Sequence, residues 1–167
     1  MNTMYVGGMY NSLPRLMRDH TTRMPVTPYA YGSCNAVNQS NWNSTVWCLN
    51  TFALNGNGVL PWQSLAGAAA MTAYDTNGLI INPGGAYGNA VASFRVHALR
   101  RGAQDAELLR LLQLKNGWSR EHCGMVVAQK VPLASYFPLS GDPLYGTLTG
   151  QGFCEMKEGV LQLLELP

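Results

Sequence analysis

The chain has 167 residues, of which 47% are hydrophobic and only 12% are charged, and its formal net charge is +2. Ordinary soluble domains are about 25% charged. The apolar content excludes intrinsic disorder, and the near-neutral balance provides no strong field for nucleic acid or an anionic membrane. No apolar run approaches the roughly 20 residues of a membrane span, and we expect no signal peptide. The length fits one domain, so the low charge is the unusual feature.

The first half of the chain alternates strand-like and helix-like segments. We expect strands at 4–6, 24–31 and 58–62 and helices at 13–18 and 40–53. An order of strand, helix, strand, helix, strand with short loops predicts parallel strands with right-handed crossovers. Strands this short and apolar suit an α/β barrel or a doubly wound sheet.

The second half is dominated by helices. Residues 66–71 form a featureless connector, predicted to be helical or irregular, and 78–82 is a strand followed by a turn. The clearest helix covers 93–114, although Gly102 interrupts it at a cost of about 1 kcal/mol relative to Ala. That glycine predicts a kink, a helix junction or a close backbone approach. Further helices are predicted at 119–130, with Ser119 as N-cap, and at 153–166, after a loop at 135–152.

Motifs for catalysis or metal binding are missing from the sequence. Cys34, Cys48, Cys123 and Cys154 form no C-x-x-C pair and have no histidine at ligand spacing, so we expect small buried hydrophobes and no metal. No nucleophile triad, P-loop or dinucleotide fingerprint occurs, and no cofactor is expected. None of the nine acidic residues follows one of the first three predicted strands. No catalytic residue is therefore assigned.

Aromatic and amide side chains do lie near the ends of those strands. Tyr31, Trp62 and the neighbouring Tyr29 could stack on a sugar ring, and Gln63 could hydrogen-bond to it. The alternative is that the rings fill the rim of the core and that Gln63 is ordinary loop polarity. Tyr31, Trp62 and Gln63 are the predicted substrate-binding residues.

Charge is concentrated on the helix predicted at 93–114, in Arg95, Arg100, Arg101, Asp105 and Glu107. Arg101 and Asp105 are four residues apart and share one helix face. A solvated face is one interpretation. We favour a structural ion-pair network that fixes the helix against a barrel, because the rest of the chain avoids charge.

The run S-F-R-V-H-A-L-R-R-G-A-Q-D-A-E-L-L at 93–109 resembles the signature S-[IF]-R-[LV]-x-x-L-R-x-G-x-x-D-x-E-x-L. That signature marks the C-terminal region of glycoside hydrolase family 123-like proteins, also classified as domain of unknown function 4091. Segments 57–62 and 78–84 resemble, in order, the final barrel strand of that family and the strand and turn that follow it. Asn82, His97 and Ala106 depart from the family pattern.

The resemblance implies an α/β fold. Residues 1–65 would be the last three β-α units of a (β/α)8 barrel, and 66–167 the following strand and C-terminal helices. Arg95, Arg100, Gly102, Asp105 and Glu107 would be structural.

The resemblance also implies a function. Family enzymes remove terminal N-acetylgalactosamine with an Asp-Glu pair that has no counterpart here, so we expect the chain to be inactive by itself. The alternative is a non-catalytic carbohydrate-binding or assembly module. Carbohydrate is the expected partner, together with self-association through exposed strand edges and apolar faces, which would account for the low charge.

Overall fold

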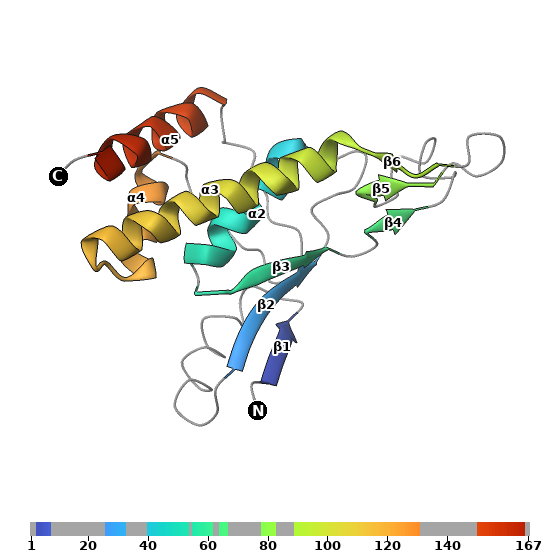
Figure 1. Ribbon diagram of the computed structural model, residues 1–167, viewed down its shortest axis with the longest axis horizontal. Helices are drawn as coiled ribbons and strands as arrows, with labels where there is room; N and C mark the ends of the chain where they lie inside the picture. The colour runs from blue at the N-terminus through green and yellow to red at the C-terminus, as the bar shows by residue number, and fades with distance from the viewer. Residues whose placement is uncertain are drawn as a thin grey trace.

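The computed structural model describes residues 3–7, 26–32, 40–53, 55–61, 64–66, 78–82, 89–130 and 150–165. Figure 1 shows the elements in chain order: β1 (Thr3–Gly7), β2 (Val26–Gly32), α2 (Asn41–Ala53), β3 (Gly58–Pro61), β4 (Leu65–Ala66), β5 (Ile80–Ile81), β6 (Val91–Ala92), α3 (Phe94–Asn116), α4 (Arg120–Lys130) and α5 (Gly150–Glu165). The helix predicted at 13–18 and nearly all of the loop predicted at 135–152 lie outside the described residues.

The first sheet contains β1, β2 and β3 in that order, and both pairings are parallel. The prediction of parallel neighbouring strands is therefore confirmed. Helix α2 connects β2 to β3 and covers one face of the sheet, where Trp47 packs against Ala30 and Val59. Asn55, with a φ of 65°, turns the chain from α2 towards β3.

A second, smaller sheet contains β4, β5 and β6, and it lies beside the N-terminal end of α3 (Figure 1). Strand β4 pairs with β5 in parallel, whereas β5 pairs with β6 in antiparallel orientation. The predicted strand at 78–82 is thus confirmed in shorter form. Strand β6 was not predicted, and β4 lies partly in the stretch that was expected to be a helical or irregular connector.

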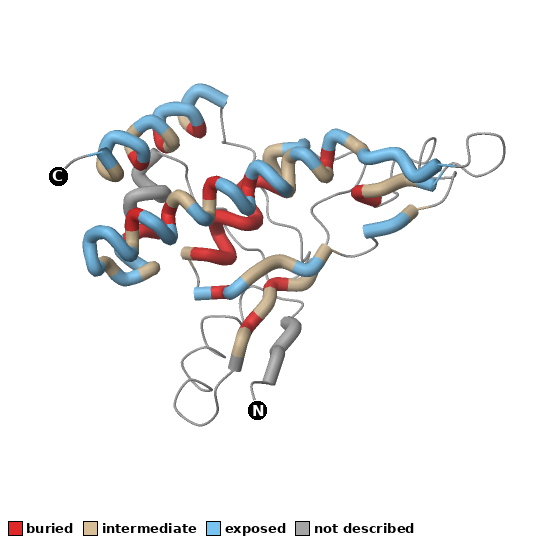
Figure 2. Tube along the Cα trace, in the orientation of Figure 1, coloured by how far each residue is buried: buried red, intermediate tan, exposed pale blue. Residues whose placement is uncertain are grey.

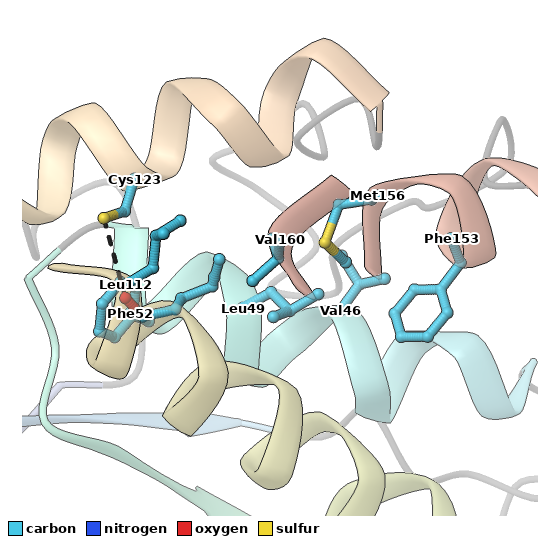
Figure 3. Close-up of a cluster of buried hydrophobic side chains, with 9 residues drawn as sticks. Val46, Leu49, Phe52, Leu112, Cys123, Phe153, Met156 and Val160 are labelled. Carbon is cyan, nitrogen blue, oxygen red and sulfur yellow. Dashed lines mark hydrogen bonds between the residues drawn. The ribbon is translucent and has the colours of Figure 1, made fainter. Parts of the chain in front are cut away.

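The main hydrophobic core lies between helices. Figure 2 shows α2 buried along most of its length, with the buried side of α3 facing it. The cluster joins α2, α3, α4 and α5 (Figure 3) and consists of Val46, Leu49, Phe52, Leu109, Leu112, Cys123, Phe153, Met156 and Val160. In α3 and α5 these side chains recur at helical spacing, so each of these helices buries one stripe, whereas α2 is buried on nearly all sides.

The helix ends follow the local sequence. Gly117 closes α3 in the left-handed conformation at φ 64°, and its N–H donates to the carbonyl oxygen of Gln113. The predicted N-cap Ser119 accepts a hydrogen bond on Oγ from the backbone N–H of His122 at 3.1 Å. No helix in the described part of the chain is both long and apolar enough to cross a membrane.

The prediction of a partial (β/α)8 barrel is wrong. The described residues form a mixed fold with two open three-stranded sheets and no closed barrel. Helices α3, α4 and α5 pack on α2 and on one another, so most of the apolar burial is between helices. The alternating pattern of the first half predicted local pairing correctly, but it contained no information on how the helices of the second half pack.

Candidate functional site

The predicted sugar-binding residues are only partly within the described residues. Tyr31 lies at the C-terminal end of β2 and is half-buried, whereas Trp62 and Gln63 lie outside the described residues. Side chains alternate between the two faces of a strand. Since Ala30 faces α2, Tyr29 and Tyr31 belong to the opposite face of the sheet. Leu60, the parallel partner of Tyr31, shares that face and is 44% exposed.

Arg95 connects α3 to the second sheet. Its guanidinium Nε donates to the carbonyl oxygen of Gly78 at 2.9 Å, and the side chain is buried. Ser93 adds a backbone hydrogen bond to the carbonyl oxygen of Leu79 at 2.9 Å. Burial lowers the pKa of Arg95 from its ordinary value. The first turn of α3 is therefore held in place by polar contacts to the strand beside it.

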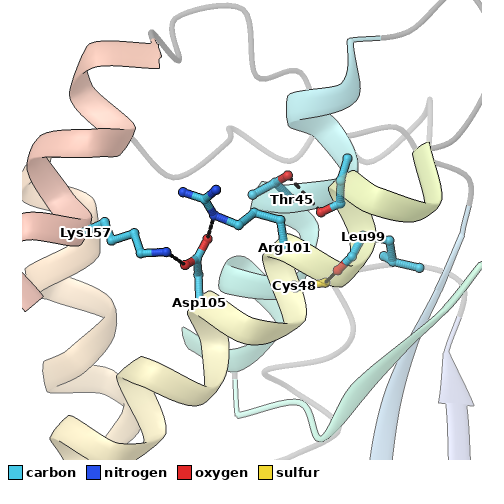
Figure 4. A network of polar contacts seen from close by, with 7 residues as sticks. Thr45, Cys48, Leu99, Arg101, Asp105 and Lys157 are labelled. Atoms are coloured by element: carbon cyan, nitrogen blue, oxygen red, sulfur yellow. Dashed lines mark hydrogen bonds and ion pairs between the residues drawn. The ribbon is translucent and has the colours of Figure 1, made fainter. Parts of the chain in front are cut away.

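At Gly102 the backbone of α3 lies close to that of α2. A Cβ atom at this position would lie 2.5 Å from the carbonyl oxygen of Thr45 and 2.8 Å from its Cα, too close for any side chain. Beside the crossing, Thr45 Oγ1 donates to the carbonyl oxygen of Ala98 at 3.0 Å (Figure 4). Of the three possibilities raised by this glycine, the structure shows the close backbone approach.

Asp105 is the buried centre of an ion-pair network. The side chain is 2% exposed, and its two carboxylate oxygens face different cations (Figure 4). Oδ2 accepts a hydrogen bond from Arg101 Nε at 2.9 Å, and Oδ1 lies 3.0 Å from Lys157 Nζ of α5. The guanidinium of Arg101 also lies over the ring of Phe153, 5.4 Å from its centroid. The network therefore joins α3 to α5.

The remaining predicted structural residues lie outside this network. Arg100 is exposed on α3. Glu107 is 67% exposed and forms an ion pair with Arg110, one turn further along the helix, at 3.5 Å. The i,i+4 spacing predicts the contact of Arg101 with Asp105, but no local signal connects Lys157, on a distant helix, to either residue.

A cavity of about 160 Å³ lies between the end of α2, the start of β3, the middle of α3 and the start of α4. Its charged lining residues are Glu107, Arg110 and Arg120. Arg120 Nη1 donates to the carbonyl oxygen of Gly56 at 2.8 Å, and the guanidinium lies 5.0 Å from the centroid of the Phe52 ring. Burial lowers the pKa of Arg120, the charge of Arg110 lowers it further, and Glu107 opposes both effects. No sequence motif indicated this site.

The cysteines divide into two kinds. Cys48 and Cys123 are buried, as expected of small hydrophobes, whereas Cys154 is exposed and Cys34 lies outside the described residues. Burial, reinforced by the nearby charge of Asp105, raises the pKa of Cys48 to about 12, and burial also raises the pKa of Cys123. Both thiols are therefore protonated and unreactive at neutral pH. Across the described residues, no group of three potential metal ligands comes together.

No family model matches the chain, and no curated protein is similar to it in sequence.

Proposed function

We propose that this chain is a non-catalytic C-terminal portion of a glycoside hydrolase-like protein, which acts on carbohydrate together with a region that supplies the acid and base carboxylates. The observation that carries the proposal is how α3 uses the residues of the hydrolase-like signature. Arg95, Gly102 and Asp105 occupy fixed positions of that signature, and each makes a buried contact with another element. These residues of the signature are thus explained by the contacts that pack α3 against neighbouring elements.

The distribution of carboxylates supports a non-catalytic role. Glycosidases place two carboxyl groups about 5–10 Å apart across the sugar bond. Strands β1, β2 and β3 contain no acidic residue, and Asp105 is already neutralised by two cations. The other acidic residues within the described ranges all belong to α3, α4 and α5.

An assay on an aryl N-acetylgalactosaminide tests this proposal. The chain alone should give no turnover, and a longer protein that includes the region encoded in frame upstream should hydrolyse the substrate. Turnover by the chain alone would contradict the non-catalytic role. A folded longer protein that neither hydrolyses nor binds the sugar would contradict the link to hydrolases.

The face of the first sheet opposite α2 favours a second candidate function, a carbohydrate-binding module. Tyr29 and Tyr31 are two residues apart, about 6.6 Å along the strand, and belong to the face opposite α2. Aromatic rings at such spacing can stack on the apolar faces of sugar rings. Titration with N-acetylgalactosamine should show binding that Tyr31→Ala removes and Tyr31→Phe retains. Equal loss in both variants would contradict stacking.

The strand edges support self-association as a further part of the proposal. In the described residues, β1 and β3 are the outer strands of one sheet and β4 and β6 those of the other. An outer strand presents unpaired N–H and C=O groups to another chain. Exposed apolar residues flank the second sheet, and Phe94 is 82% exposed.

A further inference from the structure

The cavity between α2, β3, α3 and α4 has an excess of positive charge. Two guanidinium groups, from Arg110 and Arg120, and one carboxylate, from Glu107, line a volume of about 160 Å³. The chain as a whole has few charged residues, 12% of the total, so three on one small cavity are a local concentration.

Arg120 is held in position before any ligand binds. Its Nη1 donates to the carbonyl oxygen of Gly56, while the guanidinium plane lies against Phe52. A guanidinium has five N–H donors in a rigid fork. Within the described part of the chain, the hydrogen bond to Gly56 is the one that Arg120 makes, which leaves donors available on the cavity side.

The side chain of Arg110 is held less tightly than that of Arg120. Its ion pair with Glu107 spans 3.5 Å, and the two side chains are 52% and 67% exposed. Exposed pairs of this kind contribute little, about 0–1 kcal/mol. Arg110 can therefore rotate towards a ligand at small cost. The downward effect of Arg110 on the pKa of Arg120 indicates that the two guanidinium groups repel each other across the cavity.

We propose that this cavity binds a small oxyanion, a carboxylate or a phosphate, between Arg110 and Arg120. An oxyanion accepts several N–H bonds from guanidinium forks and removes their mutual repulsion. The volume lies below the roughly 300–1,000 Å³ of pockets for drug-sized ligands, so the group that enters it is an anionic group of a few heavy atoms. Glu107 repels an anion and weakens its binding. Removal of the Glu107 charge should therefore change the affinity in the opposite direction to removal of an arginine charge.

Calorimetric titration of the whole chain with inorganic phosphate, and separately with acetate, at constant ionic strength tests the proposal. Arg110→Gln should weaken binding about tenfold by removing one charged donor. Glu107→Gln should tighten binding severalfold, because it removes the like charge. Arg100→Gln is the matched control, since Arg100 is an exposed arginine of the same helix that does not line the cavity.

The outcomes separate clearly. Saturable binding of either anion with these opposite effects supports the site, and the preferred anion identifies its source as carboxylate or phosphate. Absence of saturable binding in a chain shown by circular dichroism to be folded would overturn the proposal. So would equal affinities of the Arg110→Gln and Arg100→Gln variants, or weaker binding in Glu107→Gln, which would contradict repulsion between Glu107 and the anion. These results do not depend on the relation to hydrolases.

Discussion

The helical layer and the second sheet are stabilised by different interactions. Helices α2 to α5 share a core of nine buried side chains, and an ion-pair network joins α3 to α5. In the second sheet, by contrast, Leu65 is 73% exposed and Val91 is 55% exposed. Leu79, directly before β5, is buried, and hydrogen bonds from Ser93 and Arg95 of the α3 N-terminal region to Gly78 and Leu79 attach this sheet to α3. Packing therefore makes the helical layer stable, while polar contacts position the small sheet.

Thiol labelling should show the largest effect of this difference in packing. Cys154 should react readily with iodoacetamide, whereas Cys123, 0% exposed, should react only when α4 separates from α3. Opening of a core typically costs several kcal/mol, so we expect at least ~1,000-fold slower labelling of Cys123. Mass spectrometry of the separate peptides measures both rates. Comparable rates would show that the helical layer opens freely.

The pH dependence of stability tests the burial of the Cys48 thiol. Burial, with a smaller effect of Asp105, raises the pKa of Cys48 from 9.0 to about 12. The unfolded chain therefore loses this proton first, and stability from the buried thiol is complete below pH 9 and declines as the pH rises towards 12. Cys48→Ala should flatten the decline in unfolding free energy over that interval.

Truncation of a core side chain should show the next largest effect. Leu112 is 0% exposed and Leu114, on the same helix, is 63% exposed. Leu112→Ala should lower the free energy of unfolding by about 3 kcal/mol, because it leaves a cavity. Leu114→Ala should change it by about 0.5 kcal/mol or less. Urea denaturation compares the two, and similar losses would contradict a core located between the helices.

Two glycines test the close helix crossing with the same chemical change. Gly102→Ala places a methyl group against the backbone of Thr45 and should cost about 1–3 kcal/mol. Gly159 in α5 has no atom within 4 Å of a Cβ position, so Gly159→Ala should stabilise by about 0.4–1 kcal/mol. Thermal unfolding of both variants checks the opposite signs. A neutral Gly102→Ala would mean that α2 and α3 separate without cost.

The sequence predicted those features that have a local cause. The strands of the first sheet, the long helix and the N-cap at Ser119 follow from apolar periodicity and from residues with strong turn or cap preferences. Gly102 was correctly singled out, because a glycine inside a strong helix pattern needs a packing reason. Strands β4 and β6 have two residues each, too few for any periodicity to appear.

The features that depend on distant contacts could not be predicted in this way. The barrel interpretation came from strand order and a family resemblance, whereas the observed architecture depends on how α3, α4 and α5 pack. Lys157 of α5 pairs with Asp105 of α3. Arg120 and Arg110 line the same cavity because α4 folds back on α3. Of the predicted sugar-binding residues, Tyr31 could be placed on a sheet face, while Trp62 and Gln63 lie outside the described residues.

The Asp105 network should have a moderate effect on stability. Asp105→Asn keeps the shape of the side chain but removes the charge that faces Arg101 and Lys157, and we expect a loss of about 1–2 kcal/mol. Both cations reach solvent in part, with 46% and 29% of their side chains exposed, which limits the cost. A double-mutant cycle with Lys157→Met should give a coupling of about 0.5–1.5 kcal/mol. Additive effects would show that α5 is held by apolar packing alone.

The smallest effect on stability should come from the apolar surface near the second sheet, and it has a separate readout. Phe94 begins α3 with 82% of its surface exposed, so Phe94→Ser should change the free energy of unfolding by about 0.5 kcal/mol or less. If the surface around β4–β6 mediates self-association, the same substitution should lower the average mass seen by light scattering at high protein concentration. Arg95 remains in place to hold the sheet on α3, so a change in mass without a change in stability would assign Phe94 to an interface. A substantial loss of stability would instead show that this region has a core of its own, and the contrast with the helical layer would fail.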